Sequence, residues 1–172
     1  FWIGWGNVLR GWAASHEGDR AAGIAQIRRG LAEWRAQGSE LGGAYFLTLL
    51  ADALARHGKV TEALDALADA QAFADKTHEH YWLAERHRLE GELLLTRGPA
   101  FEDSAEALFF KARELAGRQQ AKSLELRAAI SLAKLRRRQN RPAEARVLLE
   151  PILAQFTEGF DTRDLVAAQA LL

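Results

Sequence analysis

The sequence contains no cysteine, no excess of charge of either sign and no long apolar run. Without cysteine among its 172 residues, the chain forms no disulfide, holds no thiolate-bound metal and uses no cysteine nucleophile. Its 23 basic and 23 acidic residues give a net charge of zero, which argues against a module built mainly to hold nucleic acid. No run approaches the roughly 18 apolar residues of a membrane span, and no signal-peptide pattern is present. The absence of cysteine fits a reducing compartment, and we expect no membrane or nucleic-acid partner.

Methionine is also absent, even from position 1, where the chain opens abruptly on Phe1, Trp2 and Ile3. This start predicts a piece cut from a longer polypeptide. The composition, 48% hydrophobic and 27% charged, is typical of a globular protein, and the length suits one domain over residues 1–172.

A repeat runs through the chain. Four small residues mark it at spacings of 40, 42 and 40: Gly23, Ala63, Ala105 and Ala145. A turn residue precedes each of them: Gly18, Gly58, Gly98 and Asn140. Glycine and asparagine tolerate the left-handed conformation that ends a helix, and a small residue lets two helices approach closely. The pattern predicts a helix, a tight turn and a second helix in each repeat.

Apolar residues between these marks recur at helical spacing, as in Leu47, Leu50 and Leu54, and strand alternation is nowhere sustained. We predict helices at 1–16, 19–37, 42–57, 60–77, 80–97, 102–118, 121–139 and 142–156, with a last one from about 162. One helix pair cannot bury its own apolar face, whereas a stack of pairs can.

These positions resemble the tetratricopeptide repeat, in which small, glycine, small, large and small residues follow at set spacings. The second copy supplies Ala51, Gly58, Ala63, Leu67 and Ala70. The first copy, which departs most, supplies Gly11, Gly18, Gly23, Ile27 and Gly30. A period near 40 in place of the usual 34 implies helices about one turn longer, or longer joints.

Longer strings extend the resemblance. They are GIAQIRRGLAEWRAQGSELGGAYFLTLLADAL, HRLEGELLL, RQQAKSLELRAAISLAKL and FTEGFDTRDLVAAQALL. They look like the C-terminal region of large bacterial proteins, in which a nucleotide cyclase-like or DNA-binding regulatory domain precedes a predicted ATPase module and a helical-repeat tail. The resemblance implies a cytoplasmic bacterial regulator of signal transduction, and it places neither cyclase nor ATPase activity in this segment.

The expected fold is all-α: a right-handed α-solenoid of four helix-turn-helix pairs with a terminal helix. The pairs are expected at 1–40, 41–79, 80–120 and 121–158, and the terminal helix at 161–172.

No catalytic constellation can be assembled. Gly4, Gly6 and Gly42–Gly43 lack the strand and lysine of a phosphate loop, so we expect them at helix joints. His78, His80 and His87 lack a zinc motif and are expected at the surface or in joints. We predict a protein that is not an enzyme and that uses no cofactor and no metal.

In the related repeat, the first helix of each pair lines a groove. Trp5 and Trp12 would contribute to it from the first pair. The candidate groove residues of the later pairs are Tyr45, Thr48, Asp52 and Arg56, then Glu85, Arg88 and Glu92, then Lys134, Arg137 and Arg138. This mixed, charged surface suits a peptide segment or another domain of the same polypeptide. The basic run at 134–138 is either a solvated face or a contact for an acidic peptide.

Trp2, Trp5, Leu9 and Trp12 form one stripe, at steps of 3, 4 and 3. Either they are core, covered by the next helix and Trp34, or they form an association face for a missing upstream repeat or a second copy. The leading hypothesis is a protein-interaction or regulatory scaffold. Self-association through this stripe, with a homodimer as its product, and binding of a small effector are the alternatives.

Overall fold

The computed structural model describes residues 2–172, and every regular element in that range is helical. The elements are α1 (Trp2–Glu17), α2 (Arg20–Ala36), α3 (Gly43–Arg56), α4 (Val60–Thr77), α5 (Leu83–Thr96), the 3₁₀ turn η1 (Pro99–Phe101), α6 (Glu102–Arg118), α7 (Lys122–Arg138), α8 (Pro142–Leu153) and α9 (Arg163–Gln169). The predicted helices are confirmed, and most of their bounds agree to within one residue. The larger differences are that α5 begins at Leu83 and not at 80, that α8 ends at Leu153 and not at 156, and that α9 covers Arg163–Gln169 and not 161–172. Pro151 inside α8 removes a helical hydrogen bond, which fits the early end.

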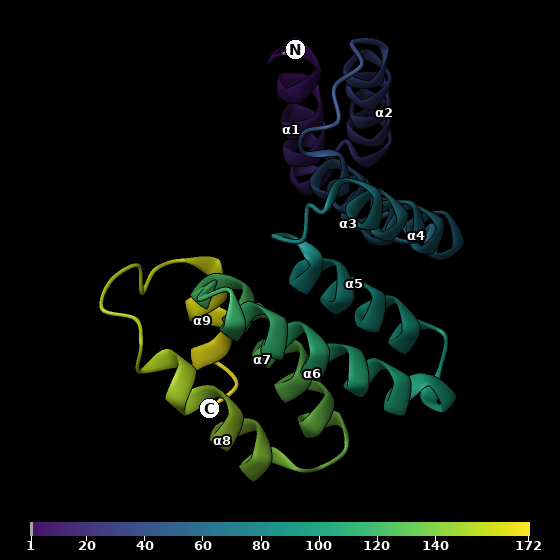
Figure 1. The fold of residues 1–172 in the computed structure, drawn as a ribbon. Coiled ribbons are helices and arrows are strands. Elements are labelled where there is room, and N and C mark those ends of the chain that lie inside the picture. Colours follow the sequence, from purple (N-terminus) through teal and green to yellow (C-terminus); the bar gives the residue numbers. More distant parts are fainter. Residues whose placement is uncertain (1) are drawn as a thin grey trace. The chain divides into compact units, whose positions relative to one another are not determined.

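The chain forms two compact units, Phe1–Trp82 and Leu83–Leu172. In the first unit α1 packs on α2 and α3 packs on α4, and α3 also contacts both α1 and α2 (Figure 1). In the second unit α6 packs between α5 and α7, α7 contacts α5 and α8, and α9 lies against α7 and α8. The predicted single domain over residues 1–172 stays a prediction.

Left-handed residues separate the helices where the repeat predicts them. Gly18, Gly58 and Asn140 have φ of 132°, 76° and 58°. Two residues other than glycine or asparagine take the same role: His78 (59°) ends α4, and Gln120 (54°) follows α6. A search for glycine and asparagine therefore does not find these two joints, at His78 and at Gln120.

Glycines bring α1 and α2 into backbone contact. A Cβ built on Gly23 would lie 2.6 Å from the carbonyl oxygen of Gly11, and one on Gly30 would lie 2.8 Å from that of Gly4. The prediction that Gly4 and Gly6 lie at a helix joint is wrong, because both are inside α1. Gly42 does lie at a joint, with φ of 84° before α3, and Gly43 opens that helix. The missed signal is the pair of seven-residue steps, Gly4 to Gly11 and Gly23 to Gly30.

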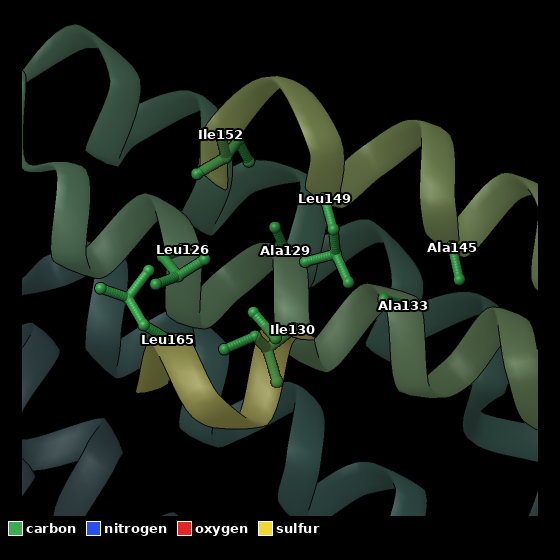
Figure 2. Close-up of a cluster of buried hydrophobic side chains, with 9 residues drawn as sticks. Leu126, Ala129, Ile130, Ala133, Ala145, Leu149, Ile152 and Leu165 are labelled. Carbon is green, nitrogen blue, oxygen red and sulfur yellow. The ribbon is translucent and has the colours of Figure 1, made fainter. Parts of the chain in front are cut away.

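Each unit has its own core. In the first unit Trp34 is 1% exposed and contacts Phe46 and Phe73 with ring centroids 5.8 and 5.7 Å away, while its Nε1 donates to the Leu41 carbonyl. In the second unit, aliphatic residues of α7, α8 and α9 close around one another, as Figure 2 shows for Leu126, Ile130, Leu149, Ile152 and Leu165. Within the described residues, no helix combines the length and apolarity needed to cross a membrane.

Candidate functional site

The candidate groove residues of α3 mostly make contacts within the first unit. Thr48 is 2% exposed and its hydroxyl donates to the Ala44 carbonyl at 2.8 Å, so it offers nothing to a partner in this conformation. Asp52 accepts from Trp12 Nε1 at 2.8 Å and pairs with Arg56 at 3.2 Å. Tyr45 packs edge-on against Trp82 with ring centroids 4.8 Å apart. Arg56, whose side chain is 37% exposed, is the most accessible of the set.

In the second unit the candidate residues of α5 form an ion network. Arg88 donates from Nε and Nη2 to the two carboxylate oxygens of Glu85, at 2.9 Å each, and from Nη1 to Glu92 at 2.5 Å. Ser131 of α7 donates to Glu92 at 2.8 Å. Arg127 of α7 donates to Glu85 at 3.3 Å. These contacts join α5 to α7 through paired, largely buried charges.

The network extends to the last helix. Arg127 Nε donates to Asp164 of α9 at 2.7 Å, so one guanidinium holds carboxylates from two other helices. Sequence reasoning did not single out Arg127 or Asp164 as parts of one site. They lie 37 residues apart, and only the packing of α9 against α7 brings them together.

The ionisation of this network is fixed by its pairing. Burial alone would raise the pKa of Glu85, but the charges and hydrogen bonds of Arg88 and Arg127 outweigh it and hold that pKa below its ordinary value. Burial likewise opposes the charge of Arg88, and Glu85 and Glu92 outweigh it and raise the pKa of that guanidinium. Both groups therefore stay charged at neutral pH, and neither is free to exchange a proton with a substrate.

The basic run of α7 divides by face. Lys134, Arg137 and Arg138 are exposed. Arg138 pairs with Glu102 at 3.2 Å and Arg137 donates to the Ala170 carbonyl at 3.3 Å, whereas Lys134 has no hydrogen bond or ion pair among residues 2–172. Arg136, predicted on a solvated or partner-binding face, is only 6% exposed. Its guanidinium is bonded to Glu106 of α6 and lies 3.4 Å from Glu144 of α8.

The tryptophan stripe of α1 is split between two environments. Trp5 packs edge-on against Phe46 with ring centroids 4.7 Å apart, and Trp12 donates to Asp52, so both face α3. Trp2 is 75% exposed and Leu9 is 40% exposed. Half of the stripe is therefore packed and half is exposed, and the association face stays a prediction.

The histidines converge on no metal site. Among residues 2–172 no group of three or more His, Asp or Glu side chains is placed to hold a metal ion. His87 is buried and not at the surface or in a joint, which corrects the prediction. Its Nδ1 lies 2.8 Å from Arg86 Nη1 and 3.9 Å from a carboxylate oxygen of Glu90, and the proximity of His87 and Arg86 lowers the pKa of Glu90.

Comparisons with known proteins identify the architecture. No protein-family model matches the chain, and no curated protein is similar to it in sequence. Among solved structures, the chain is similar to a variant of a protein from Podosopora anserina that is named for a kinesin light chain with nearly identical TPR-like repeats. That likeness has a TM-score of 0.68 at 19% sequence identity, and covers 97% of this chain and 82% of the other. The chain thus has an all-helical fold of tetratricopeptide-like repeats.

Proposed function

We propose that this chain is a protein-interaction scaffold without enzymatic activity, the C-terminal repeat segment of a larger bacterial signalling or transcription-regulatory protein. The bacterial context rests on the resemblance of the long sequence strings to such tails. The interaction role rests on the fold, since stacked helical repeats present extended surfaces that typically bind proteins or peptides. The partner is an external protein or peptide segment, or another domain of the same polypeptide.

The observation that carries the proposal is the unpaired cation Lys134 on α7, flanked by Arg137 and Arg138 on exposed turns of the helix. Other charged candidates, Glu85 and Arg88 above all, already form ion pairs inside the second unit. An acidic peptide segment would supply the carboxylates that Lys134 lacks and would compete for the weak, solvent-exposed pairs of its neighbours.

The test is a charge reversal confined to exposed residues, K134E/R137E. We expect a fluorescein-labelled, glutamate-rich peptide to bind the unchanged chain and to lose about tenfold in affinity for this variant, measured by fluorescence anisotropy. The variant K111E/R118E on α6 makes the same change of charge elsewhere in the same unit and should bind like the unchanged chain. Equal loss in both variants, or no binding to the unchanged chain, would contradict the proposal. Arg88 is not a suitable target because its replacement would disturb the buried network.

Self-association is a second candidate, favoured by the exposure of Trp2 (75%) and Ile3 (74%) on the same end of α1. We expect sedimentation equilibrium to show a mass that rises with concentration, and the variant W2E/I3E to abolish that rise. A constant monomer mass over a wide concentration range would exclude this alternative.

A further inference from the structure

A groove of about 390 Å³ lies in the first unit over α3, between α2 and α4. Its floor is aliphatic, and its two banks carry opposite charges. The floor residues are Leu31, Ala32, Leu47, Leu50, Leu54 and Ala66. The α2 bank carries Arg28 and Arg35, and the α4 bank carries Glu62, Asp65 and Asp69. None of these residues belongs to the candidate set on which the proposed function rests.

One end of this α2–α4 groove is already closed by an ion pair. Arg28 of α2 reaches Glu62 of α4 at 2.5 Å, and Lys59 also pairs with Glu62 at 2.9 Å. Toward the other end, Arg35, Asp65 and Asp69 are exposed and make no hydrogen bond or ion pair with any described residue. Asp65 and Asp69 stand four residues apart on one helix face, where like charges disfavour the helix. The open part of the groove thus has unpaired charge on both banks.

The second unit closes the corresponding place with its own side chains. Gly23 and Ala63 correspond to Ala105 and Ala145 at a constant shift of 82 residues, and α2 and α6 have the same bounds after that shift. At the same shift Leu54 corresponds to Arg136, which is bonded to Glu106 and lies beside Glu144. Ala66 becomes Leu148, which packs against the cluster of Ala105, Phe109, Leu132 and Leu135. At these two positions the second unit therefore carries a paired arginine and a leucine in place of a leucine and an alanine.

We infer that the α2–α4 groove docks an amphipathic helix of a protein partner, with an aliphatic stripe, a basic edge along Asp65 and Asp69, and an acidic edge at Arg35. Each bank spans seven residues, about 10 Å or two helical turns, which is the length over which one helix face lies in a groove. The floor leucines at 47, 50 and 54 are 4%, 9% and 1% exposed, so the facing helix would rest on a narrow aliphatic surface and be held mainly by the charged banks. The inference shares with the proposed function only the premise that the partner is a protein.

The probe is a synthetic peptide of about 18 residues, long enough to be helical, with leucines on one face, lysines along one edge and glutamates along the other. We expect it to bind the unchanged chain and to bind the variant D65K/D69K at least about tenfold more weakly, because both banks are then basic whichever way the helix runs. A second peptide with glutamates on both edges should show the reverse preference. The variant E17K/D75K changes the same number of carboxylates in the same unit outside the groove, and should bind like the unchanged chain.

Circular dichroism and the melting temperature establish that each variant is folded, and D65N/D69N replaces D65K/D69K if the latter is not. No binding of the probe to the unchanged chain overturns the inference, as does equal binding to all variants. Equal binding of a proline-interrupted peptide of the same composition overturns the helical occupant. A loss caused by K134E/R137E in place of D65K/D69K would assign the probe to the surface of the proposed function, so the two can fail separately.

Discussion

The two units share one repeat register but hold their helices together by different means. In the first unit, α1 and α2 meet through glycines whose backbones touch, and one exposed hydrogen bond of 2.7 Å from Asn7 of α1 to Glu33 of α2 accompanies that contact. In the second, Arg127 and Arg136 bridge helices through carboxylates that are partly or wholly withdrawn from water, and Arg88 pairs with Glu85 and Glu92 of its own helix. The comparison teaches that the small-residue signature sets where helices approach, while the residues around it decide whether steric fit or paired charge secures them.

The largest effect on stability is expected at the contact between α1 and α2, where the backbones leave no room for a side chain. Gly23→Ala should destabilise the chain by about 2–3 kcal/mol, because its Cβ would lie 2.6 Å from both the Gly11 carbonyl and the Ser15 amide. Helix propensity alone predicts the opposite sign, a gain of about 1 kcal/mol. Gly6→Ala is the control, since a Cβ there meets nothing within 4 Å and should stabilise α1 by about 0.5–1 kcal/mol. Urea unfolding followed by circular dichroism measures both, and a stabilised Gly23→Ala chain would refute the close contact.

A comparable loss of stability is expected from replacing one arginine of the second unit. Arg88→Met should cost about 2–3 kcal/mol, because it leaves the buried Glu85 with Arg127 as its remaining cation. Arg118→Met is the control, since its pair with Glu114 is exposed and contributes about 0–1 kcal/mol. If the two variants unfold at the same urea concentration, the network does not stabilise the second unit.

The same network gives the second unit a defined response to acid. The pKa of Glu85 is lowered in the folded chain, so its contribution is fully present above the unfolded value, near 4.5, and is lost as pH falls through the folded value. Glu85→Gln should cost about 2 kcal/mol at neutral pH, and the gap to the unchanged chain should narrow below about pH 4.5. Urea midpoints across pH 3–7 measure this stability difference. A difference that widens toward acid would contradict a lowered pKa for Glu85.

The smallest effect on stability is expected when Ala66 of the first unit is replaced by leucine, the residue at the corresponding position 148 of the second unit. Ala66→Leu places the side chain found at Leu148 beside the leucine floor, and should change stability by less than about 1 kcal/mol because Ala66, although only 6% exposed, lines the groove into which a longer side chain can extend. The reverse change, Leu148→Ala, removes packing from the Ala105–Phe109 cluster and should cost about 1–2 kcal/mol. Equal costs would show that the two places are equally filled. Ala66→Leu should also weaken docking of the amphipathic probe.

The helices and turns could be predicted because their causes are local. Glycine or asparagine in the left-handed conformation ends a helix wherever it occurs, and apolar residues at three- and four-residue steps define a buried stripe without reference to the rest of the chain. For this reason the bounds of α4 and α6 match their predictions residue for residue. The same reasoning missed His78 and Gln120, since it looked only for glycine and asparagine in the left-handed conformation that these two residues adopt.

The candidate site could be predicted only in outline. The sequence by itself determined that charged residues recur on the first helix of each pair, as Glu85, Arg88 and Lys134 do. It could not determine that Arg88 is paired with Glu85 while Lys134 has no partner among residues 2–172, or that Arg136 is buried beside its exposed neighbours. Those outcomes were decided by tertiary structure, because whether a charge is available to a partner depends on which side chains from distant helices reach it first.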